Sequence, residues 1–137
     1  MKSVLTILAV VLLLVSCKSA PPIPHDASAQ IYFQRAQSLS DDGEYVKAMK
    51  VYQDFLEYQP EAAHEDSFSA RYEIAVLQMK KNKLAEAQAG LEGILADYND
   101  LDKSSGAPAW VKILTQKMLQ EVKDRAAKPK KWFGWFG

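Results

Sequence analysis

The sequence is poor in the residue types that build disulfides and metal centres. Its 137 residues include one cysteine, Cys17, and two histidines, His25 and His64. A single cysteine excludes an intrachain disulfide and a cysteine-cluster metal site, and no HExxH motif is present. We therefore predict no metal site and no cofactor, and Cys17 must have another role.

Sequence patterns for catalysis and for nucleic-acid binding are also missing. Six glycines are present, but none forms a phosphate-binding loop, because Gly90 and Gly93 fall inside a predicted helix. The carboxylates gather at predicted helix ends and loops, where solvated caps are the usual interpretation. The only segment that combines basic and aromatic residues is short. We therefore predict no catalytic residue, no enzymatic activity and no nucleic-acid partner.

No apolar run is long enough to cross a membrane. The run over residues 4–15 follows Lys2 and is interrupted only by Thr6. A spanning helix needs about 20 apolar residues, so this shorter run is typical of the apolar region of a secretory signal. The chain as a whole has 48% apolar and 25% charged residues, which together with its length indicates one globular domain.

Acidic and basic residues are unevenly distributed, although the formal net charge is zero. Residues 26–102 carry 15 acidic and 7 basic side chains, whereas residues 103–137 carry 2 acidic and 8 basic ones. An acidic body is therefore predicted to end in a basic C-terminal part.

The end of the apolar run, Leu-Val-Ser-Cys at positions 14–17, resembles the lipobox of bacterial lipoprotein signal peptides. The resemblance implies that residues 1–16 are a signal peptide removed before Cys17, whose thiol receives a diacylglycerol and whose new amino group can receive a third acyl chain. Each buried methylene contributes about 0.8 kcal/mol, and two or three chains give stable anchoring. Lys18 implies export to the outer membrane, because an aspartate at that position is the family's retention signal. The alternative is an ordinary signal peptide with a chance cysteine.

Residues 17–27 are predicted to tether the folded part to the lipid. Prolines 21, 22 and 24 lack a backbone donor and favour an extended chain. At about 3.1 Å per residue, residues 18–25 of this segment would hold the body about 25 Å from the membrane. His25 is predicted to be a solvated part of this tether.

Apolar residues recur at helical spacing and predict five helices, over residues 28–40, 44–58, 65–81, 83–98 and 108–126. The pattern of the first two helices returns 39 residues later, and the turn residues Gly43 and Asn82 both tolerate the positive φ of a tight link. Two helices per period are typical of a solenoid. The matching pairs are Ala36 and Ala75, Ala48 and Ala87, Tyr52 and Leu91, Phe55 and Ile94, and Leu56 and Leu95.

The repeated residues resemble the tetratricopeptide repeat family. The first unit matches it at Tyr32, Ala36, Gly43, Tyr45, Ala48, Tyr52 and Pro60, and the second at Ala75, Leu84, Ala87 and Leu91. The sequence departs from the family at Arg35, Phe55, Arg71, Asn82 and Asn99, and its spacing exceeds the usual length of about 34 residues. The resemblance implies an all-α fold over residues 28–126, a short solenoid of about two helix–turn–helix repeats and a capping helix.

The resemblance also implies a concave groove lined by the first helix of each unit. Aromatic residues and methionine are favoured contact residues in such a surface. The alternative is that these side chains pack between helices. The predicted groove residues are Phe33, Gln37, Tyr72, Val76, Met79, Val111, Thr115 and Met118.

The fifth predicted helix is a half unit without a second helix, so we expect it to cap the solenoid. Leu119 is predicted to project away from its main apolar stripe. That stripe is predicted to contain Trp110, Ile113, Leu114, Met118 and Val122.

A basic aromatic tail over residues 127–137 ends the chain. Cationic side chains beside tryptophan and phenylalanine are typical of a membrane-interface anchor. Two alternatives are that the aromatic residues fold back on the last helix, or that they bind a partner protein. The tail residues concerned are Lys130, Lys131, Trp132, Phe133, Trp135 and Phe136.

The function expected from these features is that of a lipid-anchored adaptor in the bacterial envelope, on the outer membrane and facing the periplasm. Leu56, Tyr58 and Pro60, which end a repeat, are similar to residues of repeat lipoproteins in the outer-membrane β-barrel assembly machine and of Tol-associated repeat proteins. The expected partners are envelope proteins or peptides. One alternative is a surface lipoprotein whose tail contacts membrane, and another is a transport accessory that holds a small apolar ligand. No residue pattern predicts an oligomeric state.

Overall fold

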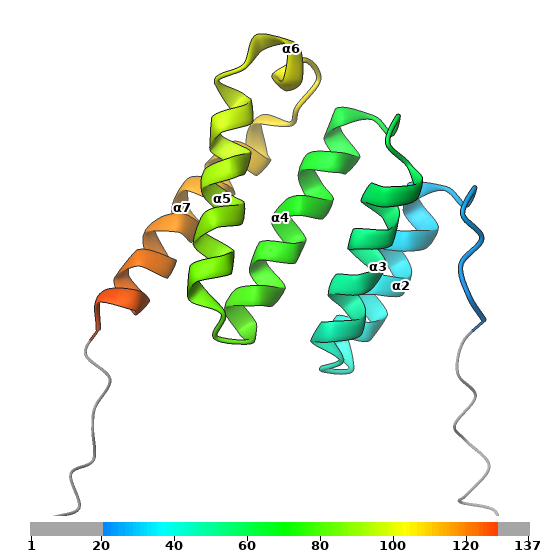
Figure 1. The fold of residues 1–137 in the computed structure, drawn as a ribbon, viewed down its shortest axis with the longest axis horizontal. Helices are drawn as coiled ribbons and strands as arrows, with labels where there is room; N and C mark the ends of the chain where they lie inside the picture. Colours follow the sequence, from blue (N-terminus) through cyan, green and yellow to red (C-terminus); the bar gives the residue numbers. More distant parts are fainter. Residues whose placement is uncertain (1–20, 129–137) are drawn as a thin grey trace, which may run out of the picture.

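Every regular element in the computed structural model is a helix (Figure 1), and the structure describes residues 21–128. The all-α fold class is therefore confirmed for this part of the chain. The five predicted helices are present with ends shifted by no more than one residue, and a short extra helix occupies the predicted loop after the fourth. The helices are α2 (Ala29–Asp41), α3 (Tyr45–Tyr58), α4 (His64–Lys80), α5 (Leu84–Tyr98), α6 (Leu101–Ser104) and α7 (Ala109–Ala127).

The α2–α3 and α4–α5 turns have the same backbone geometry. Gly43 has φ +77° and Asn82 has φ +58°, which confirms the left-handed conformation expected for both turns. In each turn the amide that follows this residue donates to a carbonyl near the end of the preceding helix, Glu44 to Leu39 at 2.8 Å and Lys83 to Gln78 at 2.9 Å. Glycine and asparagine adopt this conformation at low cost, so the two helix pairs close in the same way.

The helices pack in sequence order, each mainly against its neighbour (Figure 1). The extensive contacts are between α2 and α3, α3 and α4, α4 and α5, and α5 and α7, with lighter contacts from α4 to α2 and to α7. The short connections between these helices explain this arrangement, because antiparallel neighbours are the cheapest way to bury facing apolar stripes. α2 and α7 consequently lie at the two ends of the row.

The buried residues fall into two clusters that repeat each other. The first lies between α2, α3 and α4 and the second between α4, α5 and α7. The residues paired by the 39-residue step form the centres of the two clusters. The alanines among them are fully buried, and their small side chains let the helices approach closely. The fully or almost fully buried pairs are Ala36 and Ala75, Ala48 and Ala87, Tyr52 and Leu91, and Phe55 and Ile94.

None of the helices within residues 21–128 combines the length and the apolar character that a membrane-crossing helix requires.

Candidate functional site

Residues 21–27 lie against the helices, which corrects the prediction that the whole of residues 17–27 is a free tether. The Tyr32 hydroxyl donates to the Pro24 carbonyl at 3.2 Å, and Arg35 Nη1 donates to the Pro21 carbonyl at 3.3 Å. Ile23 packs on the first buried cluster. Proline lacks an N–H but keeps its carbonyl, so side-chain donors on α2 can fix a proline-rich chain.

His25 is exposed, as predicted, but it is also part of this contact. Its ring stacks on Tyr58 with the ring centroids 3.8 Å apart and the planes 11° from parallel. The Gln59 side chain also donates to the His25 carbonyl. Sequence reasoning missed this contact because His25 precedes α2 and Tyr58 ends α3, and only the packing of the two helices brings the rings together.

A cleft of about 290 Å³ lies between this N-terminal segment and the α2–α3 pair. Its apolar wall includes Leu39 and Val51, but Arg35 and Asp54 also line it. Its volume is at the lower end of ligand pockets, about 300–1,000 Å³, and a pair of charged groups disfavours an apolar ligand. The cleft therefore gives little support to the ligand-holding alternative.

The predicted groove residues do not line one open groove. Val111 and Thr115 are fully buried, and Tyr72 and Met79 are almost so, which contradicts their assignment to an accessible surface. The physical reason is that α7 packs across α5 and α4, so these side chains fill the space between helices. The Thr115 hydroxyl has no hydrogen-bond partner within the described part of the chain.

The other predicted groove residues also contribute mostly to packing. Phe33 is half-buried and makes edge-to-face contacts with the rings of Tyr52 and Phe55, with centroids 5.2 and 5.5 Å apart. Val76 and Met118 pack on the second buried cluster. Gln37 alone is exposed, and its amide donates to Asp41 at 2.8 Å.

α7 buries only part of the predicted stripe, since Val122 is buried and Met118 half-buried as expected. Trp110, Ile113 and Leu114 were expected in the buried stripe, but their exposed fractions are 47, 53 and 38%. The buried side consists of Val111, Thr115 and Val122, with Met118 and Leu119 half-buried. Apolar residues occur on both sides of this helix, so periodicity alone could not select the covered one.

Trp110 occupies a position that is buried in the first unit, and Leu114 one that is buried in both other units. Two steps of 39 residues relate Trp110 to Tyr32 and Leu114 to Ala36, both of which are buried under α3. One step relates Leu114 to Ala75, which is fully buried beside α5. No helix within residues 21–128 covers the corresponding side of α7 (Figure 1). We call Trp110, Ile113 and Leu114 the α7 face, and it is the candidate interaction site.

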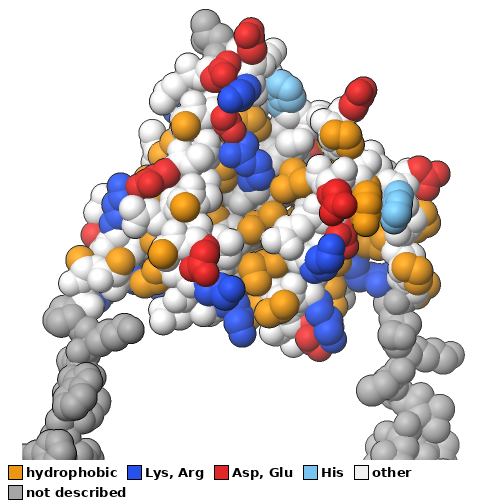
Figure 2. Space-filling model, viewed as in Figure 1, with side chains coloured by type: hydrophobic (Ala, Val, Ile, Leu, Met, Phe, Trp, Pro, Cys, Tyr) orange, Lys and Arg blue, Asp and Glu red, His pale blue; other side chains and the backbone are white. Residues whose placement is uncertain are grey.

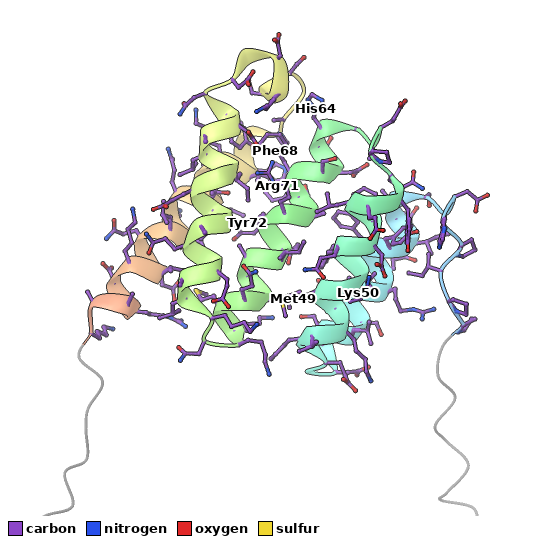
Figure 3. All side chains as sticks on the ribbon, viewed as in Figure 1. Met49, Lys50, His64, Phe68, Arg71 and Tyr72 are labelled. Atoms are coloured by element: carbon purple, nitrogen blue, oxygen red, sulfur yellow. The ribbon has the colours of Figure 1, made fainter. Side chains whose placement is uncertain are left out.

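A second cleft, of about 230 Å³, lies between α4 and α5 on the side shown in Figure 2. Arg71 lies in it and donates from Nη1 to Asp97 Oδ2 at 2.6 Å, with its guanidinium 5.6 Å from the centre of the Phe68 ring. Figure 3 labels Arg71 and Phe68 on α4, beside α5. Hydrogen bonds from Arg71 and Lys103 hold the pKa of Asp97 below its ordinary value. These groups satisfy one another, which is typical of a structural ion pair.

Several acidic groups within residues 21–128 serve as caps or ion-pair partners. The Asp100 carboxylate accepts from the amides of Asp102 at 3.1 Å and Lys103 at 3.4 Å at the start of α6. Within residues 21–128 no three histidine, cysteine or acidic side chains are grouped closely enough to hold a metal ion.

Glu73 on α4 provides a test of the electrostatics. Burial raises its pKa above the ordinary 4.5, an effect that the positive charge of Lys80 reduces. The ionised carboxylate is therefore less favourable in the folded chain than in the unfolded chain. As a result, the free energy of unfolding falls as the pH rises through 4.5 and through the raised pKa. We expect Glu73→Gln to raise the thermal unfolding midpoint at pH 7, measured by circular dichroism, and the gain to vanish near pH 4.

Glu92→Gln is the matched control for this substitution. Hydrogen bonds from Gln88 and Lys123 lower the pKa of Glu92, so its ionised form is favoured by folding. We expect no gain in the midpoint at pH 7 from this variant. A lower midpoint for Glu73→Gln at pH 7 would contradict the assignment.

The lipidation and tail predictions concern residues beyond this structure. Cys17 and the tail residues Lys130, Lys131, Trp132, Phe133, Trp135 and Phe136 lie outside the described residues.

Comparison of the chain with protein-family models, with curated proteins and with solved structures finds no match.

Proposed function

We propose that this chain is a lipid-anchored adaptor of the bacterial envelope that recruits a partner protein through the α7 face. Its body is proposed to be a short tetratricopeptide-like solenoid with α7 as the cap. Two observations support this architecture. The helices contact mainly their sequence neighbours, and the residues related by the 39-residue step are buried at equivalent places in both units.

The observation that carries the proposal is the exposure of three large apolar side chains on one side of α7. In the first two units the equivalent side is covered by α3 or α5. The shape of the α7 face is therefore suited to an amphipathic helix of a partner, laid antiparallel along it as α3 lies along α2. A tryptophan beside branched aliphatic residues is a frequent composition of binding hot spots.

Anchoring is proposed from the sequence of residues 14–17. The signal peptide would be removed before Cys17, and the acylated chain would remain at the outer membrane facing the periplasm. The half-buried groove residues Val76 and Met118 are not part of the proposed contact, because they already pack on the second cluster.

The proposal predicts that one partner is held by the α7 face. A photocrosslinking amino acid at position 110, activated in native envelopes, should join the chain to one envelope protein identified by mass spectrometry. Adding Ile113→Glu should reduce this product at least about tenfold, because a charge replaces an apolar contact of hot-spot type. Ile113 is 53% exposed, so the variant should keep its helical circular dichroism.

Val46→Glu is the matched control, because Val46 is an exposed apolar residue on α3, away from the α7 face. We expect it to leave the crosslinked product unchanged. Products that contain only this chain, or none at all, would contradict the adaptor function and favour the surface-lipoprotein alternative.

A further inference from the structure

The N-terminal segment enters the body in a defined direction. Going backward along the chain, Pro24 is bonded to Tyr32 near the start of α2, and Pro21 is bonded to Arg35 in the middle of that helix. The segment therefore runs alongside α2 toward the helix end at Asp41.

Chain length limits how far Cys17 can lie from Pro21. Three residues separate Cys17 from Pro21, and an extended chain spans at most about 3.6 Å per residue, so the distance is at most about 14 Å. From Arg35 to Asp41, α2 extends about 9 Å at 1.5 Å per residue. A lipid on Cys17 can thus reach the level of the α2–α3 turn and extend little beyond it.

Both described chain ends leave the body on the same edge (Figure 1). The turns around Gly43 and Asn82 lie on this edge, as does the end of α7 at Ala127. We call these two turns, together with the end of α7, the proximal edge. The links α3–α4 and α5–α7 lie at the opposite ends of the helices, and we call them the distal edge.

The two edges differ in charge. The α4–α5 turn on the proximal edge contains Lys80, Lys81 and Lys83, and Arg125 and Lys128 lie near the end of α7. Of these, Lys83 is paired with Glu86 at 3.8 Å and Arg125 with Glu121 at 2.6 Å. The α2–α3 turn on this edge is acidic, with Asp41, Asp42 and Glu44.

The distal edge is acidic at both links. Lys103 is bound there by Asp97 at 3.3 Å and by Asp100 at 3.4 Å. Acidic side chains are prominent along the upper edge in Figure 2, and several basic ones appear over the lower half. The acidic residues at the distal edge are Glu57, Glu61, Glu65, Asp66, Asp97, Asp100 and Asp102.

We propose that the proximal edge lies against the lipid leaflet that anchors the chain and that the distal edge faces away from it. This inference rests on the proposed function, because it assumes attachment at Cys17. The short connection keeps the body at the leaflet, the lysines of the α4–α5 turn meet anionic headgroups, and the acidic distal edge is repelled by them. In this orientation the α7 face is not turned toward the leaflet, so a partner protein can reach it beside the membrane.

Paramagnetic relaxation in lipid nanodiscs tests this orientation. The mature chain, residues 17–137, is attached in two ways, as the acylated protein purified from envelopes and as unacylated chain coupled through its single thiol to a maleimide lipid. Spin-labelled headgroups should relax the amides of Gly43 and Asn82 at least about tenfold faster than those of Glu61 and Asp100, because the helices hold the two edges about 20 Å apart. Equal relaxation at the two edges, or faster relaxation at the distal edge, would overturn the orientation.

The two attachments separate this inference from the proposed function. A chain that carries no acyl group on Cys17 in its host would refute the lipid anchor, whereas the thiol-coupled chain still decides the orientation. In anionic nanodiscs Lys81→Glu should reduce the ratio of proximal to distal relaxation at least about twofold by repelling the headgroups. Lys117 in the middle of α7 is also exposed, and Lys117→Glu should leave the ratio unchanged. Equal effects of the two variants would overturn the role of the α4–α5 turn.

Discussion

Replacement of Phe55 by alanine is expected to lower the free energy of unfolding by about 3–5 kcal/mol. Phe55 is fully buried, and its ring lies 5.7 Å from that of Tyr32 and 5.5 Å from that of Phe33. Removing it leaves a cavity and ends both aromatic contacts. A domain of this size has a total stability of about 5–15 kcal/mol, so the variant should be partly unfolded in mild denaturant. Urea unfolding followed by circular dichroism measures the loss.

Phe55→Ala also distinguishes the packing seen in the structure from the packing that the family resemblance implies at this position. Tetratricopeptide repeats usually have a small residue where this chain has Phe55, so family-like packing would accept alanine with little loss. A change below about 1 kcal/mol would therefore contradict the core described for α2 and α3. Val46→Ala is the control on the same helix, since Val46 is exposed, and we expect a change within about 0.5 kcal/mol.

Cys17→Ala is expected to move almost all of the protein from the membrane fraction to the soluble fraction. The substitution removes the thiol that would carry the diacylglycerol. At about 0.8 kcal/mol per buried methylene, the loss of two or three acyl chains removes far more binding free energy than the four aromatic side chains of the tail would replace. Fractionation of envelopes, with mass spectrometry of the mature N-terminus, measures both the location and the acyl group.

Vesicle flotation separates the anchor from the tail. Cys17→Ala protein is compared with the same variant cut after position 127, so that the only difference is the basic aromatic tail. Flotation that persists in the first and disappears in the second would support the surface-lipoprotein alternative. A wild-type chain without fatty acid would refute the proposed anchor.

Much of the helical structure could be predicted because it depends on local rules. Helix ends follow from Gly43, Asn82 and Pro60, which disfavour continued right-handed helix or tolerate the turn geometry. The buried sets of α3 and α5 follow from a single apolar stripe on each helix, as the complete burial of Ala48 and Ala87 illustrates.

The candidate site could not be predicted in the same way. The resemblance correctly placed Val111 and Thr115 on the last helix but assigned them to an accessible groove, where the structure buries them. The proline-rich segment had no periodicity to interpret, and its attachment depends on Tyr32 and Arg35, which are distant from it in sequence. Periodicity describes one helix at a time, and these contacts arise between elements.

The amino-acid sequence by itself determined the helices and their turns, because these depend on neighbours a few residues apart. The repeated positions and the separation of acidic body from basic end follow directly from the order of the residues. Only the tertiary structure decided which side of α7 is covered and where residues 21–27 lie. α7 has apolar residues on both sides, and burial of either side would satisfy its own sequence equally well. The choice between them was made by the surface that α4 and α5 present to it, and that choice leaves Trp110, Ile113 and Leu114 exposed.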